Sequence, residues 1–384
     1  MIPVCTRCAL VVKSNAYGHG IDLISTLCEQ MQLADFFCVA YLSEAVHMRT
    51  IGITTPILVM TYCDENIEQA INLNIEMGVS NNDQLFLLNT VAQHLKRAIR
   101  VHIKIDTGLS RFGFMPQQIP ALIAQIKASP HLQISGIYSH FAQSNAADQN
   151  YSTYQRTIFK GIVSQFFEAG IYPQHIHQQN SAAISTQKEP LYTMVRIGAL
   201  AYGLWSSPLQ KKLVEQEVGE ESIQQVMSLK SIIIEIKEFE TGTFIGYDCS
   251  FKTARDTRTA KVPIGYADGY FRYLGMCKQT VNVMVKGRLA PIIGYIAMNV
   301  ITIDITDIHN AQLHDEVTLI GADPEITANA LAQRIGSGNP REITTLLNPT
   351  IPRLLYEGEA TLCTNADRAP TLDASSPIEH TFEP

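Results

Sequence analysis

A lysine at the end of a short apolar run is the first candidate for chemistry in this sequence. The stretch from Leu10 to Gly20 reads LVVKSNAYGHG, so Lys13 comes a few residues before a histidine between two glycines. A lysine that ends a buried strand usually extends its amine to solvent. An amine that is desolvated beside other cations instead loses its proton more easily and becomes a nucleophile. Lys13 is therefore a candidate for Schiff-base chemistry.

Other polar residues lie at or near the ends of later apolar runs. They are Asp106, Thr107, Arg111, His140, Asn180, Ser181, Arg196 and Gly198. Taken alone, a core-edge arginine or a half-buried histidine is an ordinary structural residue. Small residues such as Ser181, Gly198 and Gly203 let backbone N–H groups approach a phosphate. A lysine beside such a phosphate site suggests pyridoxal phosphate (PLP) as the cofactor.

A regular alternation of predicted strands and helices would position these residues. Strand-like runs are expected at 9–12, 36–40, 57–60, 75–79, 101–105, 132–138, 175–178 and 194–202. Helical spacing is expected at 22–32, 42–51, 82–95, 116–128, 151–169 and 181–186. Eight such units predict an α/β fold, a (β/α)8 TIM-type barrel. The active sites of such barrels lie at the carboxyl ends of the strands, where the candidate residues fall.

The character of the sequence changes near residue 226. Long β-prone runs follow, and they predict a second, mainly antiparallel β-domain with one helix at about 326–335. The predicted domains are 1–225 for the barrel and 226–364 for the β-domain. Residues 365–384 are polar and without periodicity, and we expect a loosely ordered tail there.

Composition excludes several classes of protein. A net charge of −7 argues against a nucleic-acid-binding surface, which needs a concentrated cationic face. The apolar runs are too short for a membrane helix and no signal peptide is recognisable, so we expect a soluble cytoplasmic protein. Cys5 and Cys8 form a CxxC pair with no second pair to complete a zinc site, and no metal is expected.

An ordered set of motifs resembles the alanine racemase family over nearly the whole chain. After VVKSNAYGHG come IKIDTGLSRFGF (103–114), GIYSHFAQSN (136–145), NSAAI (180–184), MVRIGALAYG (194–203), IGYD (245–248), PIGYADG (263–269), GYIAMNV (294–300) and IPR (351–353). The resemblance implies a barrel followed by a β-domain, bound PLP, and a homodimer whose active site is shared between subunits.

The resemblance also assigns catalytic roles. Lys13 would hold the cofactor covalently and act as the base for one enantiomer, and Tyr247 of a partner subunit would act on the opposite face. Racemisation needs two such groups, one to remove the α-proton and one to deliver a proton. His140 and Arg196 would tune the tyrosine. Arg196 would also face the pyridine nitrogen and keep it unprotonated, which limits transamination.

Binding roles follow from the same motifs. Arg111 would contact the cofactor's phenolic oxygen and the substrate carboxylate, supported by Lys104, which is often carbamylated in relatives; a plain buried ion pair is the alternative. The cofactor contacts match Tyr17, Asn180, Ser181, Gly198 and Ala199. The backbone of Met298 would orient the substrate carboxylate, and Tyr266 and Arg272 match residues of an entry channel.

Three departures from the family pattern bear on the substrate. Pro349 stands where a tyrosine often contacts the phosphate, and Ala297 and Asn299 replace a frequent Cys and Asp. Relatives also usually carry some two dozen residues before the lysine motif, so either the chain begins late or its domain packing differs.

The expected activity is interconversion of L- and D-alanine for peptidoglycan. A racemase for serine or a larger amino acid, or a non-catalytic PLP-binding protein, are the alternatives.

Overall fold

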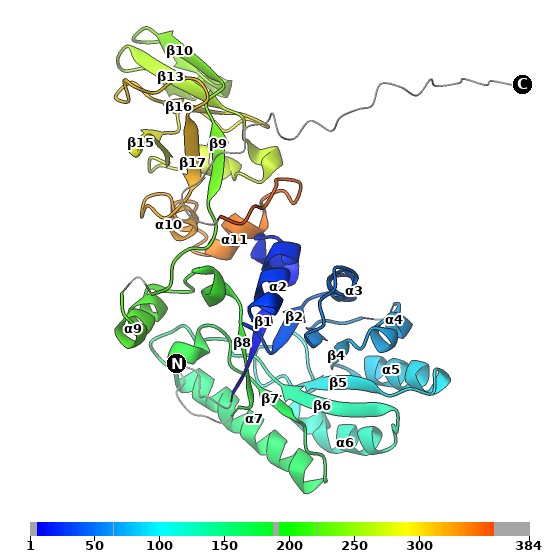
Figure 1. The fold of residues 1–384 in the computed structure, drawn as a ribbon. Helices are drawn as coiled ribbons and strands as arrows, with labels where there is room; N and C mark the ends of the chain where they lie inside the picture. Colours follow the sequence, from blue (N-terminus) through cyan, green and yellow to red (C-terminus); the bar gives the residue numbers. More distant parts are fainter. Residues whose placement is uncertain (1–5, 64, 187–191, 221, 357–384) are drawn as a thin grey trace, which may run out of the picture. The chain divides into compact units, whose positions relative to one another are not determined.

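The computed structural model describes residues 6–63, 65–186, 192–220 and 222–356, and its first half alternates strands with helices (Figure 1). The strands are Arg7–Val11 (β1), Phe36–Val39 (β2), Ile57–Val59 (β3), Glu76–Val79 (β4), Ile99–Lys104 (β5), Leu132–Tyr138 (β6), His175–His177 (β7) and Met194–Ile197 (β8). The helices are Lys13–Tyr17 (α1), Ile21–Gln30 (α2), Leu42–Thr50 (α3), Ile67–Asn72 (α4), Asn82–His94 (α5), Ile119–Lys127 (α6), Asn150–Glu168 (α7), Ala183–Thr186 (α8) and Pro208–Val218 (α9).

The eight strands form one sheet in the order β7-β6-β5-β4-β3-β2-β1-β8. All hydrogen-bonded neighbours in it run parallel. Two backbone hydrogen bonds connect its ends: Thr193 N donates to Ile176 O and Arg196 N to Gln179 O, both at 3.1 Å. The predicted (β/α)8 barrel is thereby confirmed.

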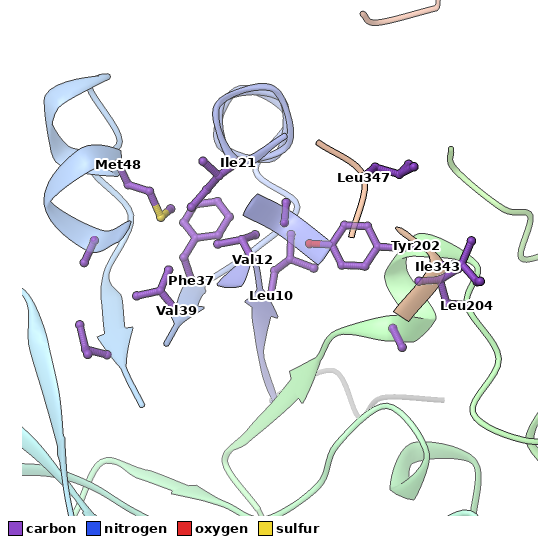
Figure 2. Packing of buried hydrophobic residues seen from close by; sticks show 14 of the residues in the cluster. Leu10, Val12, Ile21, Phe37, Val39, Met48, Tyr202, Leu204, Ile343 and Leu347 are labelled. Atoms are coloured by element: carbon purple, nitrogen blue, oxygen red, sulfur yellow. The ribbon is translucent and has the colours of Figure 1, made fainter. Parts of the chain in front are cut away.

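Strand residues alternate between the inside of the barrel and its helical shell. Ala9 and Val11 of β1 pack with Phe36 and Cys38 in an inner cluster. Leu10, Val12, Phe37 and Val39 face the other way, against helix residues such as Ile21 and Met48 (Figure 2). A strand that is covered on both faces reads as a continuous apolar run, which is why these strands were detectable as such runs.

The expected strand at 194–202 is wrong beyond Ile197. Gly198 leaves the strand conformation at φ −122° and ψ −103°, and Ala199–Tyr202 form a 3-10 helix (η2). The Tyr202 side chain is buried, and its hydroxyl donates to Val11 O at 3.0 Å. An apolar run has the same sequence signature in a buried strand and in a buried helical turn, so periodicity could not separate them.

The second half is mainly antiparallel, as predicted. Its strands are Leu229–Ile232 (β9), Glu235–Phe239 (β10), Phe244–Ile245 (β11), Phe251–Lys252 (β12), Thr257–Val262 (β13), Asn282–Val285 (β14), Arg288–Pro291 (β15), Ile301–Asp304 (β16) and Glu316–Ile320 (β17). They form the antiparallel sheets β10-β13-β16, β11-β12 and β15-β14-β17-β9. The expected helix at 326–335 is Ala328–Arg334 (α10), and Pro340–Thr345 (α11) follows it.

Helix α11 packs against the barrel element that carries Lys13. Ile343 and Leu347 join the hydrophobic core beside Tyr202 and Leu204 (Figure 2). Gly18, at the end of α1, lies so close that an added Cβ would be 1.9 Å from Thr344 O. A residue of the second half can therefore reach the mouth of the barrel. The tail expected at 365–384 lies outside the described residues. In the part of the chain that is described, no helix is both long and apolar enough to span a membrane.

Candidate active site

The segment after β1 makes a single left-handed helical turn. Ser14, Asn15, Ala16 and Tyr17 have φ values between 52° and 55°. For L-residues this conformation costs about 1–2 kcal/mol per residue, so four in a row require external support. Such strain in ordered segments is concentrated at functional sites. Because of this turn, Lys13 and Tyr17 both line the same pocket.

Hydrogen bonds on both sides hold the turn. Glu44 accepts from Ser14 N at 2.6 Å, and Asn15 Oδ1 accepts from Ile21 N at 2.8 Å. Within the turn, Gly18 N donates to Ser14 O at 3.1 Å. Within the motif KSNAYG, the side chain of Asn15 thus ties the turn that follows Lys13 to the start of α2.

The pocket lies at the carboxyl ends of the strands and has a volume of about 330 Å³. It brings together most of the predicted barrel residues. These are Lys13, Tyr17, Arg111, His140, Asn180, Ser181, Arg196, Gly198 and Ala199. This volume lies at the lower end of the range for small-molecule sites, roughly 300–1,000 Å³.

Positive charge dominates the pocket. Lys13, Arg111, Arg196 and Arg341 line it, and no acidic residue is among the described lining residues. Burial, and next the charge of Arg111, lower the pKa of Lys13 below its usual value, although Glu44 opposes the shift. The arrangement favours a neutral, nucleophilic amine and an anionic ligand.

Lys104 is not part of this pocket's lining but lies next to two residues that are, Phe112 and Tyr138. Its Nζ is 5.2 Å from the ring centroid of Phe112 and 5.6 Å from that of Tyr138. Burial, and next the charge of Arg111, lower its pKa to about 8. Among the described residues no carboxylate lies within ion-pair distance of Lys104, so the plain buried ion pair considered above does not form there.

The side of the pocket near η2 is built for close approach of small groups. An added Cβ on Gly198 would be 2.6 Å from the Tyr17 hydroxyl, so the absence of a side chain at Gly198 lets this hydroxyl lie against the backbone. Gly198 N donates to Ser181 Oγ at 2.8 Å. Asn180 Oδ1 accepts from Ala182 N and Ala183 N at 3.1 and 3.0 Å, which fixes the loop that carries Ser181. The hydroxyls of Tyr17 and Ser181 meet the backbone of Gly198 here.

Arg196 and His140 are directly connected. Arg196 Nη2 donates to Ser139 O at 2.7 Å and to His140 Nδ1 at 3.2 Å. Burial, and next the charge of Arg196, lower the pKa of His140 well below its usual value. A neutral imidazole that accepts at Nδ1 carries its hydrogen on Nε2. Among the described residues, the polar contact of this Nε2 is the amide nitrogen of Asn180 at 3.4 Å, which is itself a donor, so the N–H is available to an acceptor in the pocket.

Three predicted residues do not join this pocket. Tyr247, Tyr266 and Met298 lie on the β-domain, with 71%, 43% and 55% of their surfaces exposed. Arg272, the other predicted channel residue, is exposed as well. None of these residues lines the pocket of its own chain.

The β-domain nevertheless gathers these residues in neighbouring loops. Tyr266 N donates to Ala297 O at 3.1 Å and Ala267 N to Met298 O at 2.9 Å. The loop of Tyr247 adjoins the same segment, since Ser250 Oγ accepts from Tyr295 N at 3.2 Å. The result is one exposed group of loops that carries the predicted second base and the predicted carboxylate contact together.

Two residues that line the pocket were not predicted from the sequence. Arg341 of α11 and Tyr138 of β6 line the pocket, but neither stood out in the sequence pattern. Arg341 donates to Asn339 Oδ1 at 2.7 Å and supplies a positive charge near Lys13 and Tyr17. Pro349, where a tyrosine was expected, is exposed and is not part of the lining.

Family matches cover both halves of the chain. Residues 1–206 match the family "Alanine racemase, N-terminal domain", and residues 226–355 match "Alanine racemase, C-terminal domain". The predicted domain boundary at 225/226 falls at the start of the second match and stays a prediction.

Individual relatives agree along nearly their whole length. The alanine racemase of Methanococcus maripaludis is 35% identical over 348 residues, which cover 90% of each chain. That of Clostridium tetani is 35% identical over 349 residues, covering 90% of this chain and 87% of the relative.

Solved structures show the same fold. Alanine racemase from Clostridium difficile 630 superimposes with a TM-score of 0.83 at 30% identity, covering 90% of this chain and 88% of the other. The Bacillus anthracis enzyme with bound L-Ala-P gives a TM-score of 0.80 at 28% identity, with 90% and 87% covered. From these matches and from the barrel followed by antiparallel sheets, the chain belongs to the alanine racemase family.

Proposed function

We propose that this protein is a PLP-dependent alanine racemase that works as a homodimer with shared active sites. The observation that carries the proposal is the division of the predicted residues. Lys13 and the predicted cofactor contacts share one cationic pocket, whereas Tyr247 and Met298 lie together on exposed loops. A two-fold dimer can bring the loops of one subunit to the pocket of the other.

The residues of the pocket fit PLP, the cofactor that this family uses. An amine of lowered pKa suits covalent attachment to an aldehyde. The hydroxyls of Tyr17 and Ser181, held close to the backbone at Gly198, suit the phosphate. Arg341 adds a positive charge to the pocket, which suits the anionic phosphate. Arg196 stays charged at neutral pH, so it would not give a proton to the pyridine nitrogen that we expect it to face.

Bound PLP would withdraw electrons from the substrate's Cα and so make the α-proton acidic. In the proposed reaction, Lys13 Nζ takes or returns this proton on one face. Tyr247 Oη of the partner subunit does the same on the other face. The Nε2–H of His140 can donate to this phenolic oxygen and stabilise its deprotonated form, because that N–H is available in the pocket. Arg196 holds His140 in the required tautomer.

Substrate orientation would involve both chains. Arg111, at the open side of the pocket, can bind a carboxylate, and Asp106 shapes its loop by accepting from Gly108 N and Leu109 N at 2.9 and 3.0 Å. The backbone N–H of Met298 makes no hydrogen bond within the described part of the chain, so it is available to the same carboxylate. Tyr266 lies beside it, where it can narrow the entrance.

We expect Lys104 to be carbamylated, with a clear dependence on pH. Only the neutral amine reacts with carbon dioxide, and a pKa of about 8 leaves roughly half of Lys104 neutral at pH 8 and a tenth at pH 7. The carbamate would place a negative charge beside Arg111, which is otherwise surrounded by cations. Carbon-13 NMR of protein equilibrated with labelled bicarbonate should show one carbamate signal that grows between pH 7 and 9. Its persistence in Lys104→Gln would assign the modification elsewhere.

Alanine is the substrate that the relatives' names support, and such an activity would supply D-alanine for peptidoglycan. The substitution at Pro349 keeps serine in consideration, since the pocket lacks a tyrosine side chain there. Racemisation of alanine, serine and lysine should be compared at equal concentrations by polarimetry. We expect kcat/KM for alanine to exceed that for serine by about ten- to a hundredfold, the discrimination that a small pocket supplies. Equal values would make this a broad-specificity racemase, and no turnover of any of them would favour the non-catalytic PLP carrier.

A further inference from the structure

A chain of buried polar side chains crosses the inside of the barrel behind Arg196. Arg196 Nη1 lies 2.5 Å from His177 Nδ1, and His177 Nε2 lies 2.8 Å from His102 Nδ1. His102 Nε2 lies 2.8 Å from Glu76 Oε2. All four side chains are buried, with at most 4% of their surfaces exposed. They come from β8, β7, β5 and β4.

The backbone of β6 makes this connection possible. His102 on β5 must pass in front of β6 to reach His177 on β7, and Gly136 stands at that point. An added Cβ on Gly136 would be 2.1 Å from His102 Nδ1. The absence of a side chain at Gly136 is therefore a requirement of the His102–His177 hydrogen bond.

The donor and the acceptor of every hydrogen bond in this series of side chains follow from its two end groups, Glu76 and Arg196. An ionised carboxylate only accepts and a guanidinium only donates. Glu76 must therefore accept from the Nε2–H of His102, whose Nδ1 then accepts from the Nε2–H of His177. His177 Nδ1 is left to accept from Arg196. One arrangement of hydrogens satisfies all three contacts, with both imidazoles neutral and protonated at Nε2.

The ionisation states of the end groups agree with this assignment. Burial raises the pKa of Glu76, but hydrogen bonds from His102 and Ser135 and the charge of Arg100, whose Nε lies 3.4 Å from Glu76 Oε1, act against burial, and the net pKa is lowered. Burial, and next the charge of Arg196, lower the pKa of His177 well below its usual value. Among the described residues no carboxylate lies within ion-pair distance of Arg196. Glu76 is the carboxylate that this series of hydrogen bonds reaches, two imidazoles away, and its other oxygen lies 3.4 Å from Arg100 Nε.

We propose that Glu76 is a positioning residue for Arg196 and acts on it through the Nε2–H tautomers of His102 and His177. A reversed tautomer would turn an N–H of His177 toward the N–H groups of Arg196, and the guanidinium would have to move. The functional consequence rests on the proposed function, in which Arg196 faces the pyridine nitrogen of PLP. A displaced Arg196 would allow that nitrogen to be protonated, so the fraction of turnovers that end in transamination would rise.

The first test measures tautomers in the cofactor-free protein. Two-bond proton–nitrogen NMR of protein with ¹⁵N-labelled histidine distinguishes the Nε2–H, Nδ1–H and doubly protonated rings. We expect neutral Nε2–H rings for both His102 and His177. A hydrogen on Nδ1 of His177, or a charged ring there, overturns the proposal. This measurement needs no variant and no catalytic activity, so it stands even if the proposed function fails.

The second test uses Glu76→Gln, whose amide has nearly the same shape but can offer an N–H to His102. We expect a second tautomer of His177 and about a ten- to hundredfold rise in pyruvate formed per racemisation event, taking as a guide the size of the effects when hydrogen-bond partners of metal ligands are removed. The matched control is His175→Phe. His175 stacks on His102 at 5.6 Å and 5° without belonging to the chain, and its replacement should leave both readouts unchanged. If Glu76→Gln loses thermal stability but forms no more pyruvate per racemisation event, the hydrogen-bonded side chains have only a structural role. That result overturns the proposal.

Discussion

Lys13→Ala is expected to abolish racemisation and the visible absorption of the lysine-bound cofactor together. The change removes both the covalent attachment and one of the two proton-transferring groups. General acid–base catalysis alone contributes about 10²–10⁴-fold, so we expect a loss of at least about a thousandfold in kcat. Activity and absorbance are measured on the same purified sample after addition of PLP.

Two further variants test whether the covalent link to Lys13 or only its positive charge is needed. Lys13→Arg keeps the positive charge in the pocket but cannot form the covalent link, and it should be as inactive as Lys13→Ala. Lys127→Ala removes an exposed lysine at the end of α6 and should behave as wild type. If a borohydride-reducible PLP adduct remains in Lys13→Ala, the cofactor is attached to a different lysine.

Mixing two inactive parents is expected to restore activity if Lys13 and Tyr247 of one site come from different subunits. Homodimers of Lys13→Ala and of Tyr247→Phe each contain two defective sites. In a mixed dimer one site carries both defects, while the other takes Lys13 from the tyrosine variant and Tyr247 from the lysine variant and is intact. The physical basis is that Tyr247 is 71% exposed on its own β-domain and is absent from its own chain's pocket lining.

The recovered activity follows from the statistics of reassembly. Random reassembly of equal amounts makes about half of the dimers mixed, each with one working site of two, so about a quarter of wild-type activity should return. Co-expression with two affinity tags gives mixed dimers directly, which should have about half of wild-type activity. Mixed dimers as inactive as both parents, while the intact-lysine chain binds PLP, would place Tyr247 outside the shared site.

Much of the barrel was predictable because parallel strands covered on both faces are apolar throughout. Helix α4 was missed because its apolar stripe of Ile67, Ala70 and Ile71 spans little more than one turn, and α9 was missed because it buries only Gln210 and Val214. In the β-domain the long β-prone runs were not divided further, but between β9 and β10 the polypeptide passes from one sheet to another. Residues alternate between buried and exposed in the same way whichever sheet a strand joins, so the sequence pattern does not reveal a change of sheet.

The candidate site was predictable where a motif carries it and not where tertiary packing creates it. The motif around Lys13 predicted a lysine at the pocket, where Lys13 lies, but not the left-handed turn, since Ser14, Asn15 and Ala16 do not demand it. Arg341 reaches the pocket only because α11 packs on α1. The chain from Glu76 to Arg196 joins strands far apart in the sequence, and no local pattern relates residues at such distances.

The central claim, that this protein moves the α-proton of alanine on both faces, is tested most directly by isotope exchange. The purified protein with PLP is incubated with L-alanine, and separately with D-alanine, in deuterium oxide, and proton NMR follows the signal at Cα. We expect the Cα–H signal to disappear from either enantiomer while the enantiomers approach a ratio near one. No exchange from either enantiomer, in protein that carries PLP on Lys13, would contradict the account and leave a PLP-binding protein without racemase activity.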